Sequence, residues 1–135
     1  QVTIAVGEPG EDLDGWRLSH RQAIAALPVA LRSGEKLVRY RNIALLASVL
    51  QDELAVISLR ELYLIPLEDE RDGGTAARET LRAYFAADRN VSSAAAELGI
   101  KRHTVTNRLR AIEDRLAQPL NACAEDIAIA LHLDD

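Results

Sequence analysis

The N-terminal third of the chain has the apolar spacing of a strand, then of a helix, then of a second strand. Residues 2–6 form a short apolar, β-branched run, which predicts a buried strand. Between residues 16 and 32 apolar side chains recur at helical spacing, and residues 37–40 again have the composition of a strand. This order predicts a small strand–helix–strand unit.

The helix predicted over residues 16–32 has one recurrent apolar face and an internal proline. Pro28 is expected to kink this helix or end it early, because proline has no amide hydrogen and clashes with the preceding turn. Gly34 is expected to stop it in any case. The apolar residues that recur on one face are Trp16, Ala23, Leu27 and Leu31.

The rest of the chain is predicted to be helical, with one break. Residues 43–67 have the composition of two helical segments that meet near Asp52-Glu53, and the polar stretch 68–74 with its Gly-Gly pair predicts a linker. Four helical patterns follow, over residues 75–87, 91–98, 102–116 and 122–133. The expected fold class is therefore mainly α, with a small α/β part at the N-terminus.

Two of these helices are joined by a short turn at Gly99. A residue just past a helix end often adopts a positive φ, which costs glycine least. Ala94 and Ala95 are small enough to let the next helix approach closely, and Val105 is expected to pack against them. Two short helices at a steep angle, with the second projecting outward, predict a helix-turn-helix.

The predicted helix-turn-helix also contains a local cluster of positive charge. The net charge is −5, so the surface as a whole does not favour polyanions. The stretch from Gly99 to Ile112 nevertheless contains several cations and no acid. These cations are Lys101, Arg102, Arg108 and Arg110.

The helix of residues 102–116 is expected to present a hydrogen-bonding, cationic face. With Val105 turned into the core, His103 and Asn107 point outward, and no carboxylate follows until Glu113. A helix of this kind fits the major groove, so double-stranded DNA is the expected partner. The expected base readers are Arg102, His103, Thr106 and Asn107, and the expected phosphate ligands are Lys101, Thr104, Arg108 and Arg110.

Residues around this stretch follow a recognisable order and spacing. They are Thr80–Phe85, Asn90-Val91, Ala95, Leu98–Ile100, Arg102–Val105, Arg108–Arg110 and Pro119-Leu120. In these residues the chain resembles the C-terminal helix-turn-helix of PucR/CdaR-type bacterial transcription regulators. The resemblance implies a DNA-binding regulator that acts as a homodimer on paired half-sites in the bacterial cytoplasm, and not an enzyme.

A second resemblance concerns the N-terminal residues. They are Val2–Ile4, Gly7, Ala23, Ala26, Ala30 and Val38–Tyr40. In these the chain resembles the closing strand–helix–strand of a GGDEF-like domain, without the signature loop or metal-binding carboxylates of a nucleotide cyclase. The resulting division is a GGDEF-like remnant over 1–44, connecting helices and linker over 45–74, and a helix-turn-helix helical bundle over 75–135.

Other chemistry finds little support in the sequence. Cys123 is the single cysteine, which excludes an internal disulfide and favours a reducing compartment. The histidines are too scattered for a zinc site, so neither a metal nor a cofactor is expected. No apolar run approaches the roughly 20 residues that span a bilayer. Because the chain begins with Gln1 and has no methionine, we expect a fragment of a longer protein, whose preceding region would bind any small-molecule effector.

Two alternatives to DNA binding remain open. One is a protein-interaction bundle whose basic helix docks an acidic partner, since four cations can also form an ordinary solvated face. The other is a fragment of a GGDEF-type nucleotide-signalling protein. In the last helix, Ile129 and Leu133 are expected either to form part of a dimer contact or to be buried within the chain.

Overall fold

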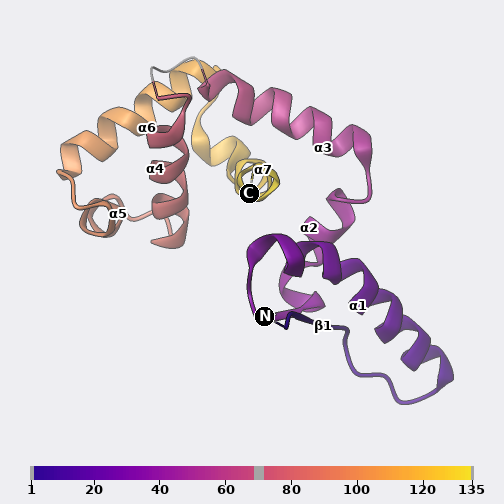
Figure 1. Cartoon of the computed structure of the whole chain (residues 1–135). Helices are drawn as coiled ribbons and strands as arrows, with labels where there is room; N and C mark the ends of the chain where they lie inside the picture. The colour runs from indigo at the N-terminus through magenta and orange to yellow at the C-terminus, as the bar shows by residue number, and fades with distance from the viewer. Residues whose placement is uncertain (1, 69–71, 135) are drawn as a thin grey trace. The chain divides into compact units, whose positions relative to one another are not determined.

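The chain divides into two compact units. The computed structural model describes residues 2–68 and 72–134, so Gln1, Asp135 and residues 69–71 of the predicted linker lie outside the described part. One unit ends at Val56 and the other covers Ile57–Asp134. Helices dominate both (Figure 1), and the strands are confined to the first, which confirms the predicted mainly α class with a small α/β part.

The N-terminal unit is a strand–helix–strand followed by a second helix. The two strands pair in parallel, with Ile4 opposite Leu37 and Val6 opposite Arg39. A Cβ atom on Gly7 would collide with the backbone of Ser19, so glycine lets the chain pass close to the helix. The elements are β1 (Ile4–Val6), α1 (Leu13–Ser33), β2 (Leu37–Arg39) and α2 (Tyr40–Val49).

Helix α1 buries a different face from the one that its apolar spacing suggested. Its buried residues are Ala26, Val29 and Ala30, whereas Leu27 is 42% exposed and Leu31 66% exposed. Trp16 is also exposed and stacks on His20 instead of entering a core. The helix therefore carries two apolar stripes, and the one made of smaller side chains is buried.

Of the two effects predicted for Pro28, a kink or an early end of the helix, the early end is wrong. α1 continues to Ser33 and ends at Gly34, which has the positive φ of 68° expected at a helix C-terminus. Pro28 lies on the exposed side of the helix. Pro28 has no N–H, so the carbonyl of Ile24 has no helical hydrogen-bond donor. Ile24 is itself exposed, so water can take the place of that donor.

Helices are the only regular secondary structure among the described residues of the C-terminal unit. α3 (Glu53–Leu59) begins before Ile57 and continues into a π-helical turn, η1 (Arg60–Leu64), and a 3-10 turn, η2 (Ile65–Leu67). Pro66 has no amide hydrogen to continue an α-helix, which accounts for the irregular turns around it. After the linker come α4 (Thr75–Ala86), α5 (Val91–Leu98), α6 (Arg102–Leu116) and α7 (Leu120–Leu133), close to the predicted helices.

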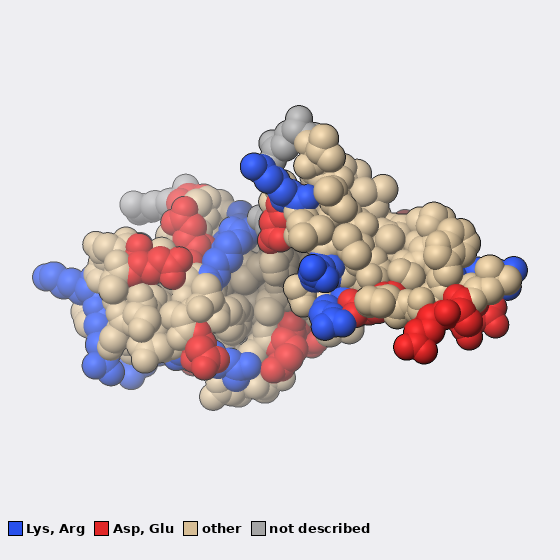
Figure 2. Space-filling view, turned by 90° about the horizontal axis from the view of Figure 1, so that it is seen from below, with Lys and Arg blue, Asp and Glu red and all other residues tan. Residues whose placement is uncertain are grey.

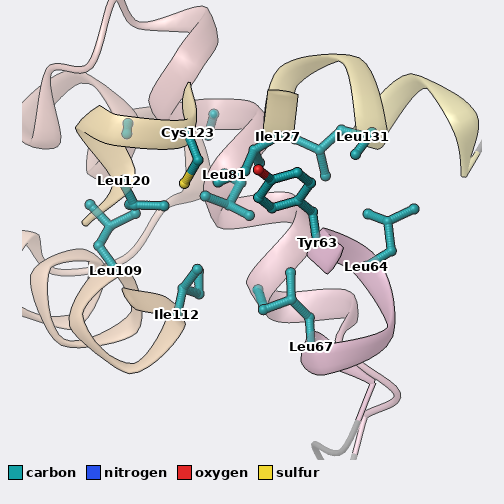
Figure 3. Close-up of a cluster of buried hydrophobic side chains, with 14 of the residues drawn as sticks. Tyr63, Leu64, Leu67, Leu81, Leu109, Ile112, Leu120, Cys123, Ile127 and Leu131 are labelled. Atoms are coloured by element: carbon teal, nitrogen blue, oxygen red, sulfur yellow. The ribbon is translucent and has the colours of Figure 1, made fainter. Parts of the chain in front are cut away.

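One apolar core holds this unit together, and the segment before the linker contributes to it. Figure 3 shows side chains from η1, η2, α4, α6 and α7 converging on a common interior. Tyr63, Leu64 and Leu67 are at most 7% exposed. Residues that the sequence suggested were connecting helices therefore pack into the helix-turn-helix unit.

The C-terminal end of α7 is held by two arginines from other elements. Arg60 of η1 donates to the carbonyl oxygen of Leu133 at 3.0 Å, and Arg82 of α4 donates to that of Leu131 at 3.2 Å. The last carbonyls of a helix have no partner within it, and cations are favourable at that end. Leu133 itself is buried, so it packs within the chain.

Candidate nucleic-acid interface

Local hydrogen bonds fix both ends of α5, including the turn that leads to α6. The side chain of Asn90 accepts from the backbone N–H of Ser93 at 3.0 Å and caps the start of α5. At the other end Gly99 has φ 65°, and Ile100 N–H reaches back to the carbonyl of Ala95 at 3.1 Å. A Cβ on Gly99 would meet no atom within 4 Å, so glycine is required for its backbone conformation and not for space.

The rotation of α6 about its axis is the one that the sequence predicted. Val105 is fully buried, and Leu109 and Ile112 below it are 8% and 1% exposed. Ala94 and Ala95 of α5 are buried too, and α5 contacts α6. The opposite face of α6 therefore points away from the core.

The outward face of α6 forms a shallow, open depression of about 420 Å³. His103 and Asn107 are exposed one turn apart, with the amide nitrogen of Asn107 3.3 Å from Nε2 of His103. Because every lining side chain comes from one helix, only a molecule laid along α6 could complete this site. The lining residues are Arg102, His103, Thr106, Asn107 and Arg110.

The lysine and the two threonines of the predicted site differ in their surroundings. Lys101 is exposed just before the helix, and Thr104 is half-buried. Thr106 donates its hydroxyl proton to the carbonyl of Arg102 at 3.2 Å, so outward it offers only an acceptor.

The side chain of Arg108 points toward α4 and not toward the outward face of α6. It is half-buried, and its Nη1 donates to the hydroxyl of Thr80 on α4 at 3.2 Å. The structure therefore separates Arg108 from the cations of the outward face.

A second hollow of about 220 Å³ adjoins the first, because Thr106 and Arg110 line both. Tyr84, Val91 and Asn121 also line it, and they come from α4, α5 and α7. The residue spacing along α6 could not predict these lining residues, because they come from other helices that pack beside α6 in the folded unit.

Other cations of this unit already have partners. Arg78 pairs with Asp134 at 2.9 Å, and Arg89 pairs with Glu125 at 3.3 Å. Among residues 2–68 and 72–134, no carboxylate lies within salt-bridge distance of the exposed cations Lys101, Arg102 and Arg110. Figure 2 shows Lys and Arg side chains gathered at the left edge of the face in view, the side on which α5 and α6 lie in Figure 1.

The described ranges contain no group of three His, Cys, Asp or Glu side chains that could hold a metal ion. Cys123 is buried, and this burial raises the pKa of its thiol. Nor does any single helix of these ranges have the length and apolar character needed to cross a membrane.

Part of the helical region is similar to a known family. Residues 77–134 match the family model of the PucR C-terminal helix-turn-helix domain. No curated protein matches the chain significantly. The match supports a helix-turn-helix of the PucR type, as the residues of this region suggested, and associates it with DNA-binding regulators, which are generally not enzymes.

Proposed function

We propose that the chain is a sequence-specific DNA-binding transcription regulator of the PucR type, with α6 as the recognition helix in the major groove. The observation that carries this proposal is the outward face of α6. It is free of carboxylates from Arg102 to Ile112, and in the described residues its exposed cations have no acidic partner. A surface of this kind attracts a polyanion, and an α-helix fits the major groove.

The proposed roles follow from position on the helix. Arg102, His103, Thr106 and Asn107 read base edges, since they line the open depression. A guanidinium can donate two bonds to a guanine edge, and an amide can pair with an adenine edge. Lys101, Thr104 and Arg110 bind phosphates and set the register of the helix.

The proposal extends to a homodimer on DNA. Helix-turn-helix proteins commonly read two half-sites about one helical turn apart, and the two-fold symmetry of the protein is matched by that of the site. A small-molecule effector would act on such a dimer from outside the helical unit.

Selection of bound sequences from random DNA is the test. An enriched motif with two related half-sites is expected, together with a linear fall of log K with log salt. A triple variant, Lys101→Ala, Arg102→Ala and Arg110→Ala, should lose binding. The control removes three exposed cations of the N-terminal unit, Arg21, Arg32 and Lys36, and should retain it. Absence of enrichment, or equal loss in both variants, contradicts the proposal and favours an acidic protein partner.

For the N-terminal unit we propose a structural part of GGDEF-like type that performs no nucleotide chemistry. The parallel pair β1 and β2 joined by α1 supports it, because this is the arrangement that the resemblance implied. Calorimetric titration with GTP and with cyclic dinucleotides should give no saturable heat. Saturable binding would revive the signalling-protein alternative.

A further inference from the structure

Thr80 is a fully buried polar side chain in the core-facing side of α4. Its hydroxyl donates its one proton to the carbonyl of Ala76 at 2.7 Å. Toward α6 the hydroxyl can therefore only accept a hydrogen bond. A buried acceptor left without a donor costs about 1–3 kcal/mol, so this position calls for a donor from the neighbouring helix.

Arg108 supplies that donor. A guanidinium carries N–H groups and no acceptor, and Nη1 of Arg108 lies 3.2 Å from the Thr80 oxygen. The positive charge of Arg108 also interacts with the carboxylate of Asp72. The pKa of Asp72 is lowered chiefly because its carboxylate accepts from the backbone N–H of Ala76, with a smaller contribution from the charge of Arg108.

Base reading depends on how α6 is turned. His103 and Asn107 extend from the helix into the outward depression, so a small rotation of α6 moves their ends by a larger distance. Recognition requires the reading groups to be held within roughly 0.5 Å of their productive positions. A hydrogen bond from α6 to the buried side of α4 restrains that rotation.

We infer that Arg108 is a positioning residue, which fixes the recognition helix on α4 through Thr80, and that it is not a phosphate ligand. The inference rests on the proposed DNA binding and refines it. Arg108 no longer counts among the predicted phosphate ligands, and its role is to hold α6 in the orientation that base reading requires.

The first experiment compares Arg108→Gln with Arg110→Gln in the full chain, by measuring DNA affinity over a range of salt concentrations. Arg110→Gln should weaken binding to every sequence and reduce the salt slope by about one ion. Arg108→Gln should leave the slope unchanged, and should weaken the preferred site about 3- to 10-fold while affinity for random DNA stays the same. A slope reduced by about one ion in Arg108→Gln overturns the inference.

The second experiment changes Thr80, which is buried and cannot touch DNA. Thr80→Val should reproduce the loss of specificity, whereas Thr80→Ser keeps the hydroxyl and should bind DNA like the wild type. The double variant Thr80→Val with Arg108→Gln should bind no more weakly than Arg108→Gln alone. Additive losses, or a Thr80→Val variant that binds its site as tightly as the wild type, overturn the inference.

The two proposals fail in different ways. If the wild-type chain binds no DNA, the proposed function is wrong, and the same double-mutant cycle measured by urea unfolding decides whether Thr80 and Arg108 are coupled. If Thr80→Val does not fold, the comparison of Arg108→Gln with Arg110→Gln still decides between a phosphate ligand and a positioning residue.

Discussion

The carboxylate of Glu113 accepts a hydrogen bond from the backbone N–H of Leu120 at 2.9 Å, so α6 caps the helix that follows it. Pro119 stands at the usual capping position and has no side-chain oxygen to offer. A negative charge at a helix N-terminus is also favourable to the helix dipole. This hydrogen bond links α6 to α7.

Removing this cap should destabilise the C-terminal unit. Glu113→Ala is expected to lower the free energy of unfolding by about 1 kcal/mol, whereas Glu113→Gln should keep most of the bond. The measurement is thermal unfolding followed by circular dichroism. Asp114→Ala, next to it and exposed, is the control, and equal effects of the two alanine variants would show that the cap contributes nothing.

Ala117 ends α6 in the left-handed conformation, with φ 55°. A side chain with a Cβ is strained there, so Ala117→Gly should raise the free energy of unfolding by about 0.5–1 kcal/mol. The opposite is expected of Ala111→Gly, because Ala111 is exposed in the interior of α6, where glycine costs about 1 kcal/mol. Two shifts of the same sign would contradict the backbone argument.

Val105→Asp should unfold the helix-turn-helix, because it places an unpaired charge at a fully buried position. Loss of helical signal and of the cooperative melt of the C-terminal unit is expected. Ala111→Asp, on the exposed side of the same helix, should fold. A Val105→Asp variant that melts like the parent would mean that α6 is turned differently.

Asn107→Ala tests base reading. It should cost about 1–3 kcal/mol on the preferred site and much less on random DNA, with the salt slope almost unchanged. Asn42→Ala removes an exposed amide from the N-terminal unit and should change neither affinity. Equal weakening on all sequences would assign Asn107 to the backbone instead.

Asp72 should make stability depend on acid pH. Its carboxylate accepts from the backbone N–H groups of Gly74 and Ala76, which holds its pKa below the ordinary value for an aspartate. Since the folded pKa is the lower one, the stabilisation is complete above the unfolded pKa of about 4 and is lost as pH falls through the folded value. Asp72→Ala should be less stable than the parent at pH 7, and the difference should shrink as pH falls below about 4. A difference that is constant with pH would exclude the carboxylate as its cause.

Local sequence was sufficient to predict the bounds and the buried side of α6, but not the contacts that α6 makes with other helices. The bounds of α6 and the burial of Val105 follow from periodicity within one helix, and both predictions are confirmed. The partner of Arg108 lies 28 residues away on α4, so no spacing along α6 could reveal that this cation turns inward. In α1, two apolar stripes satisfied the same helical period, and the choice between them depended on packing in three dimensions.

Because η1 and η2 pack beneath α7, the compact helical unit begins earlier in the chain than the region that is similar to the family. Sequence similarity to the PucR domain begins at Ala77, but a fragment cut there would lose Tyr63, Leu64 and Leu67 from its interior and the Arg60 bond at the end of α7. Burying a large apolar side chain contributes about 1.5–3 kcal/mol, and a whole domain is stable by only about 5–15 kcal/mol. We therefore expect the smallest piece that folds on its own to begin near Ile57, where the compact unit begins, and not at Ala77, where the similarity to the family begins.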